Sequence, residues 1–181
     1  TGSVSHSEFP PEKTHTIDYS QMPTPEQVML LIKSRRSTRT LTSRPVPKEM
    51  LDKIVETAHS APTATNSQSL SFTVVTDPRK LRQVSDYTIG VFDSLAKLLL
   101  NPVVKCVVKP FMKDVYKYVP VFNRLKEEHK AGKDPILRKA TALLLIHTPK
   151  SNRFGSEDAN LAYQNASLMA QSLGVSQIYM G

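Results

Sequence analysis

The sequence predicts a mixed domain of the α+β class, and three observations support this prediction. Apolar residues recur at helical spacing in several segments. Two short apolar runs, Ser71–Val75 and residues 142–147, have the composition of strands. These segments alternate along a chain of 181 residues, with 39% hydrophobic and 22% charged residues, which suits one globular domain.

The first predicted helix begins after Thr24. Thr24 is a suitable N-cap, Pro25 fits the first helical position, and Gln27 completes a capping box. Its apolar face contains Val28, Leu31 and Ile32. Residues 1–23 have little apolar content and no period, so we expect a tail or linker there and a domain over 24–181.

A second helix begins near "PVPKEM" and ends before Pro62, because the residue that precedes a proline avoids the α region. The strand Ser71–Val75 follows, and Asp77 and Pro78 then cap a third, short helix. The second helix has a predicted buried stripe of Met50, Leu51, Ile54, Val55 and Ala58, and the third contains Leu81 and Val84.

Residues 87–139 predict a helical excursion from the main sheet, with helices near Val91–Leu100 and Val121–His129. Prolines 102, 110 and 120 separate these stretches. The chain's single cysteine, Cys106, lies in the apolar run "VVKCVV", so we expect it to be buried and unreactive. A lone cysteine fits a reducing compartment, and the default prediction is the cytoplasm.

The last third predicts a strand, a helix and a strand. "ALLLIH" at 142–147 has the pattern of a buried central strand. In the helix that follows, Ser156 is a candidate cap, Asp158 suits the first turn better than a role as catalytic acid, and Gly174 suits the C′ position. "VSQIYM" is then a last strand.

The net charge of +8 and the sequence pI of about 9.6 favour anionic partners. Nucleic acid, a phosphorylated cofactor and an acidic protein all remain open, because charge alone does not choose among them. No apolar run reaches the roughly 18 residues of a membrane span, so we expect no membrane partner.

Two polar segments could carry chemistry. "RRSTR" at 35–39 offers guanidinium groups and hydroxyls, as a solvated helix end, a phosphate site or a nucleic-acid patch would. "APTATNSQS" at 61–69 is either a loop that bonds its own backbone or a ligand-holding loop. Asn66 and Gln68 each offer a donor and an acceptor, which matches a heterocycle edge such as the pyrimidine ring of a flavin.

The order of "RRSTR", "VPKEMLDKIVETAHSAPTATNSQS", "SFTVV" and "EDANLAYQNASLMAQSLGVSQIYMG" resembles the nitroreductase family of flavin enzymes. The resemblance covers about 33–77 and 140–181 and is weak over 78–139, apart from "GKDPIL". It implies a three-layer α/β/α sandwich with a central mixed, mostly antiparallel sheet. It also implies an intertwined homodimer with FMN at its interface.

The resemblance assigns cofactor-binding roles to three segments. Residues of "RRSTR" would hold the FMN phosphate and the polar edge of the ring, the 62–68 loop would reach the flavin from the partner subunit, and the last strand would place its backbone against the ring, with the Met180 amide near the flavin N5. The residues are Arg35, Arg36, Ser37, Arg39, Pro62, Thr63, Ala64, Asn66, Gln68, Ile178, Tyr179, Met180 and Gly181. We nominate no catalytic acid or base and no metal site, and His59 and His147 are expected to be structural.

Two departures and one subgroup qualify the resemblance. Many relatives have Pro-Trp where this chain has Ser69-Leu70, so one wall of the site is altered. Relatives also continue past the position of Gly181 with basic residues and a segment that wraps the other subunit, so a C-terminal portion is expected beyond this sequence. In one subgroup a ferredoxin-like module with two iron–sulfur clusters precedes the flavin domain, and the "GKDPIL" phrase and the polar N-terminus resemble it.

The activity implied by the resemblance is ping-pong transfer of electrons from NAD(P)H, or from a ferredoxin, through FMN to a small acceptor such as a nitroaromatic or a quinone. One alternative keeps the fold and changes the reaction, to dehydrogenation, dehalogenation or fragmentation of the flavin. A second is a flavin module that relays electrons for a ferredoxin domain. The alternative from another class is a basic nucleic-acid-binding domain, although no recognition motif accompanies the charge.

Overall fold

The computed structural model describes residues 17–180. Most of the predicted tail, as well as Gly181, lies outside the described residues. The chain divides into two units, residues 1–34 and 35–181, which are described separately. The first contains a short 3-10 helix, η2 (Tyr19–Gln21), and helix α1 (Pro25–Ser34).

The capping box of α1 is confirmed. The Thr24 amide donates to Gln27 Oε1 at 2.9 Å, and the Gln27 amide donates to Thr24 Oγ1 at 3.3 Å. Two backbone N–H groups at the helix start, which have no partner inside the helix, are thereby satisfied.

In the second unit, strands β1 (Ser71–Val75) and β2 (Leu143–His147) pair antiparallel, with Ser71 opposite His147. The α+β prediction is confirmed. The predicted burial of β2 is wrong, because Leu145 is 43% exposed. Since side chains alternate across a strand, Leu144 and Ile146 pack into the core while Leu145 points to the opposite face.

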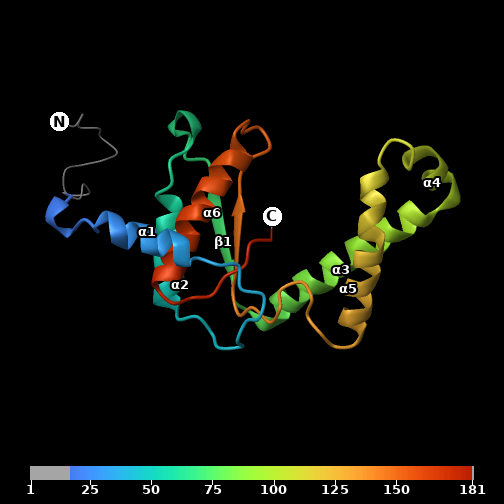
Figure 1. Ribbon diagram of the computed structural model, residues 1–181, viewed down its shortest axis with the longest axis horizontal. Helices are drawn as coiled ribbons and strands as arrows, with labels where there is room; N and C mark the ends of the chain where they lie inside the picture. The colour runs from blue at the N-terminus through green and yellow to red at the C-terminus, as the bar shows by residue number, and fades with distance from the viewer. Residues whose placement is uncertain (1–16, 181) are drawn as a thin grey trace. The chain divides into compact units, whose positions relative to one another are not determined.

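Helices α2 (Lys48–His59) and α6 (Gly155–Ser172) pack side by side on one face of this sheet (Figure 1). Small side chains allow the two helices to approach closely. Of the predicted α2 stripe, Ile54 and Ala58 are buried and the other three residues are half-buried. The buried centre of the cluster consists of Ile54, Ala58, Ala61, Ala162, Ala166 and Ala170.

The two ends of α6 differ in their capping. The helix begins at Gly155 after Phe154, which makes no side-chain cap, so the prediction of Ser156 as the cap is wrong. At the other end Gly174 has a φ of +69°, and the Val175 amide donates to the Ala170 carbonyl at 2.8 Å, as the C′ prediction expects. The predicted last strand is reduced to one parallel bridge between Ser37 and Gln177.

The excursion is helical, as predicted, but its first helix is not short. Asp77 caps α3 (Pro78–Leu100) by accepting from the Arg79 amide at 2.8 Å, and α3 then runs without a break through the predicted helix at 91–100. Gly90 does not interrupt it, because one glycine costs a helix only about 1 kcal/mol. The chain continues with α4 (Pro102–Val108), η4 (Lys113–Tyr118) and α5 (Val119–Lys130).

Helices α3 and α5 pack together along the excursion. Phe92 and Phe122 stack with ring centroids 4.8 Å apart, and Asp93 accepts ion pairs from Lys97 and Lys126. Near the sheet, Val75 and Leu143 pack against a second core cluster, made of Leu81, Ile89, Ile136 and Leu137. Helices therefore contact both faces of the sheet.

Cys106 is exposed, so the prediction that it is buried is wrong. "VVKCVV" forms α4, and its neighbours Val103 and Val107 are also mostly exposed, at 73% and 63%. An apolar run predicts burial, but this one forms part of the surface. Within residues 17–180, no helix has the length and hydropathy needed to cross a membrane.

Candidate functional site

The structure brings two of the three predicted site segments together. The Thr38 amide donates to the Gln177 carbonyl at 3.0 Å, and Ser37 and Gln177 form a parallel bridge. Residues 35–39 therefore lie alongside the chain that leads to Ile178, Tyr179 and Met180, although the two segments are about 140 residues apart in sequence.

The basic segment presents cationic groups at the surface. Arg35 is half-buried, whereas Arg36, Ser37 and Arg39 are exposed. The Arg36 guanidinium donates to the Arg35 carbonyl at 2.9 Å. Exposed guanidinium groups beside a hydroxyl form a donor set suited to an anion with several oxygens.

Side chains of α6 fix the C-terminal segment. The Tyr163 hydroxyl donates to Gln177 Oε1 at 2.9 Å, and the Tyr179 hydroxyl donates to Asn160 Oδ1 at 3.1 Å. The Tyr163 and Tyr179 rings also contact, with centroids 4.5 Å apart. Among the described residues, Gln177 Nε2 is buried without a hydrogen-bond partner. Sequence reasoning missed Asn160, Tyr163 and Gln177, because a polar residue on a helix or strand carries no signal of its partner.

The 62–68 loop has an unusual backbone. Three of its non-glycine residues have positive φ: 54° at Thr65, 53° at Asn66 and 46° at Gln68. Thr65 and Asn66 belong to a short 3-10 turn, η3 (Ala64–Asn66). This left-handed region is disfavoured for residues with a Cβ, and most of all for a β-branched one such as Thr65. Such strain persists only where surrounding contacts hold it, and it is concentrated at functional sites.

Asp158 holds this loop in place. Its Oδ1 accepts from the Ala64 amide at 2.8 Å, and the Asp158 side chain is almost fully buried at 1% exposure. Within the loop, the Gln68 amide donates to Thr63 Oγ1 at 3.0 Å and the Asn66 amide donates to the Thr63 carbonyl at 3.0 Å. The prediction placed Asp158 in the first turn of the helix, which is confirmed, but did not foresee that it anchors the loop.

A second polar cluster anchors the far end of the loop. Asn152 Nδ2 lies 2.8 Å from Ser69 Oγ, 3.2 Å from Thr148 Oγ1 and 3.3 Å from Asp158 Oδ2. Ser69, one of the two residues noted in the sequence as a departure from the family pattern, contributes a hydroxyl to this network. The loop is thus tied both to the end of β2 and to the start of α6.

Within one chain, the 62–68 loop lies on one side of α6, and residues 177–180, which pair with residues 35–39, lie on the opposite side. Asp158 binds the loop, and Asn160, two residues later, binds Tyr179. Residues two positions apart in an α-helix are separated by about 200° around the helix axis, because each turn contains 3.6 residues. The loop and the C-terminal segment are therefore held by different sides of the same helix.

The two histidines make structural contacts. The ring centroids of His59 and Phe72 are 6.0 Å apart, and His147 Nε2 lies 3.2 Å from Thr73 Oγ1 on the neighbouring strand. A small cavity of about 10 Å³ lies beneath the loop, lined in part by His59, Thr63 and Gln68. It has room for about one water molecule, so a larger ligand would bind on the outside of the loop.

Curated relatives share part of this chain. The FMN reductase [NAD(P)H] of Bacillus subtilis is 28% identical over 160 residues, which cover 86% of this chain and 54% of that protein. Iodotyrosine deiodinase 1 of Rattus norvegicus is 33% identical over 84 residues, which cover 40% of this chain and 30% of that protein. The matches therefore span about half, or less, of the length of these relatives.

Solved structures share the fold. A nitroreductase with bound FMN from Bacteroides fragilis aligns with a TM-score of 0.62 at 22% identity, over 83% of this chain and 67% of that one. An oxidized iodotyrosine deiodinase bound to FMN and 3-iodo-L-tyrosine aligns with a TM-score of 0.59 at 20% identity, over 85% and 74%. At this identity the likeness establishes the fold alone.

The family model described as "Nitroreductase family" matches residues 32–181, which include both polar segments, the sheet and α6. Because the match covers most of the chain, this protein belongs to the nitroreductase family.

Proposed function

We propose that the protein is an FMN-dependent oxidoreductase that passes electrons from NAD(P)H to a small acceptor such as a nitroaromatic or a quinone. The pairing of residues 35–39 with Gln177 is the observation that carries this proposal. The pairing puts the cationic residues 35–39 beside the irregular backbone that follows Gln177. This arrangement suits a ligand with a phosphate group and a planar ring.

The donor set of the first segment fits the FMN phosphate. Arg35 and Arg39 supply guanidinium groups that can form charge-assisted, paired hydrogen bonds, and Ser37 adds a hydroxyl. The half-buried position of Arg35 limits screening of its charge by water. The relatives that bind FMN, by their printed descriptions, support the choice of this anion.

The loop fits the polar edge of the ring. Asn66 and Gln68 both have positive φ, and Gln68 Nε2 donates to Asn66 Oδ1 at 3.3 Å, so the two amides lie together. Paired amides can donate to carbonyl oxygens and accept from a ring N–H. Because the anchored backbone is already ordered, little conformational entropy would be lost when a ligand binds.

We infer a homodimer with the cofactor at its interface. The placement of the loop and the basic segment on different sides of α6 supports this inference, since a second chain could bring the basic segment of one copy to the loop of the other. Pro62, Thr63 and Ala64 would then face the ring held by the partner's basic segment.

When bound, FMN would supply the redox chemistry, accepting a hydride from NAD(P)H and giving two electrons to the second substrate. The chain's part would be placement and electrostatics: Arg35 and Arg39 would offset negative charge, and the backbone at Met180 would contact the cofactor. One site that receives each substrate in turn predicts ping-pong kinetics. The cytoplasmic location and the link to a ferredoxin remain predictions.

The test is a flavin titration of the purified protein, extended beyond Gly181 if the natural chain continues. We expect a yellow protein that absorbs near ~450 nm, releases FMN on denaturation, and is bleached by NADH or NADPH and reoxidised by a nitroaromatic or a quinone. A colourless protein that ignores added FMN would refute the proposal.

Reductive dehalogenation is a second candidate, because several iodotyrosine deiodinases are similar to this chain over 40% of its length. Release of iodide from 3-iodo-L-tyrosine by the reduced protein would favour this reaction. Turnover of nitroaromatics without iodide release would exclude it.

A further inference from the structure

The segment from Leu98 to Lys113, called here the tip segment, contains no aspartate or glutamate. It includes α4 and the turn before η4, and Asp93 and Asp114 are the nearest acidic residues on either side. Helix α3 leads from β1 to this segment over 23 residues, a helical length of about 34 Å. The tip segment therefore lies far from the sheet and its loops.

Apolar side chains of the tip segment face solvent. Exposure reaches 86% at Phe111 and 73% at Val103, with Leu98, Leu100, Val107 and Met112 all above half. Single exposed apolar residues are common on proteins, but a run of them within one short segment marks an interaction surface.

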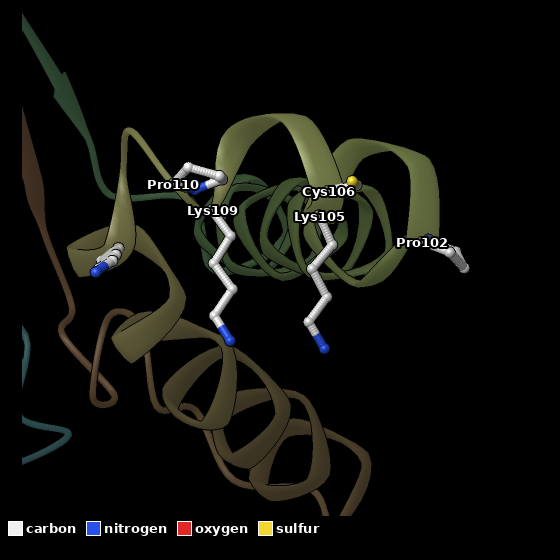
Figure 2. Close-up of a pocket in the computed structure, with 6 residues that line it drawn as sticks. Pro102, Lys105, Cys106, Lys109 and Pro110 are labelled. Carbon is white, nitrogen blue, oxygen red and sulfur yellow. The ribbon is translucent and has the colours of Figure 1, made fainter.

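Three lysines of the tip segment have no acidic neighbour to offset their charge. Lys105, Lys109 and Lys113 form no ion pair with a carboxylate among the described residues. Of the lysines on other helices, Lys53 and Lys80 are also unpaired, and Lys48, Lys97, Lys117, Lys126 and Lys130 form ion pairs. The three unpaired lysines line one shallow hollow of about 610 Å³, together with Pro102, Cys106 and Pro110. Figure 2 shows the side chains of Lys105, in α4, and Lys109, directly after it, extending side by side in the same direction.

We propose that the tip segment binds the surface of an anionic lipid bilayer. Exposed apolar side chains would enter the boundary between headgroups and acyl chains, and the three lysines would contact anionic headgroups. A basic, amphipathic segment without acidic residues has the composition of such surface-binding elements. The sequence prediction of no membrane partner considered only spanning segments, whereas binding to the surface requires none.

A second copy of the chain fits this surface less well. In a contact between the tip segments of two copies, each lysine cluster would face another cluster of the same charge, with no acidic residue from the tip segment to offset it. A bilayer with anionic lipids supplies both the apolar layer and the negative charge that the surface lacks.

The test is sedimentation of the full chain with vesicles of phosphatidylcholine, alone or mixed with phosphatidylglycerol. We expect binding only to the mixed vesicles, and weaker binding as salt rises. The triple variant Lys105→Gln, Lys109→Gln, Lys113→Gln should bind roughly 100-fold more weakly, since each lysine near an anionic surface contributes about fivefold. The matched control Lys53→Gln, Lys80→Gln, Lys150→Gln loses the same charge at exposed sites elsewhere and should bind nearly as the parent does.

A second measurement tests insertion. Cys106, the chain's single cysteine, can carry an environment-sensitive fluorophore, whose emission should shift to the blue on anionic vesicles. The pair Val107→Ser, Phe111→Ser should reduce this shift, and the pair Tyr87→Ser, Val91→Ser, exposed elsewhere on α3, should not.

Three outcomes would overturn the proposal. The first is equal loss of binding in the lysine triple variant and its control. The second is salt-sensitive binding without a fluorescence shift, which would indicate adsorption by charge alone. The third is a change of oligomeric state in the Val107, Phe111 pair with no change in vesicle binding, which would assign the surface to a second copy of the chain.

Discussion

Asp158 Oδ1 accepts a hydrogen bond from the Ala64 amide at 2.8 Å, which joins residues 94 positions apart in the chain. The carboxylate is buried, and its other oxygen lies 3.3 Å from Asn152 Nδ2. One acidic side chain at the start of α6 therefore holds a strained loop against the helix, and the proposed cofactor contacts depend on that loop.

Asp158→Ala should lower the free energy of unfolding by about 2 kcal/mol, because the Ala64 amide and Asn152 Nδ2 would lose the carboxylate that accepts their hydrogen bonds. Denaturant unfolding measures this change. Glu157→Ala is the matched control, since Glu157 is exposed and also lies in the first turn of α6. Both variants lose a favourable charge at the helix start, so the difference between them reports the loop contact. Equal losses would show that the contact contributes nothing.

Thr65→Gly should stabilise the protein by up to about 1 kcal/mol, because glycine adopts positive φ without the steric cost that threonine bears. Thr88→Gly, inside α3, should have the opposite sign and destabilise by a similar amount. Thermal unfolding of both variants checks the pair. Destabilisation by both would mean that Thr65 is not strained.

Arg35→Ala and Asn66→Ala should each weaken FMN binding about tenfold or more, since each removes a polar contact proposed for the cofactor. Equilibrium titration of apoprotein with FMN measures the dissociation constant. Arg79→Ala and Asn123→Ala replace exposed residues of the same types on α3 and α5 and should leave it unchanged. Unchanged affinity in both test variants would place the site elsewhere.

Gly155→Ala should destabilise by about 1–3 kcal/mol, because a Cβ at this buried position would overlap the Thr148 methyl group. Rotation of Thr148 would relieve the overlap only by displacing its hydroxyl from Asn152 and Ser69. Thr148→Ser removes the methyl and keeps the hydroxyl, so it should restore much of the loss in the double variant. A double-mutant cycle in urea measures the coupling, and purely additive effects would contradict this packing.

Ion pairing should make stability depend on pH through Asp93. Hydrogen bonds from Lys126 first, and then from Lys97, lower the pKa of Asp93 from 3.8 to about 2. The folded state thus favours the charged carboxylate, so this contribution is complete above the unfolded pKa and is lost as pH falls through about 4 to 2. Asp93→Asn should flatten the decline in melting temperature over that window. An unchanged acid profile would show that Asp93 does not contribute to it.

Local signals sufficed where neighbours in sequence decide the structure. The capping box at Thr24, the cap at Asp77 and the C′ glycine at Gly174 are all confirmed, because each depends on residues only a few positions apart. The α+β class followed from periodicity, and the family from the order of short motifs.

Tertiary structure alone decided the remaining features. An apolar run cannot show which side will be covered, so Cys106 and Leu145 are more exposed than their runs predicted. Asp158 could not be matched with Ala64, nor Ser37 with Gln177, because hydrogen bonds between distant segments leave no spacing pattern in the sequence. The sequence determined which groups were available, and long-range packing around α6 decided which of them meet.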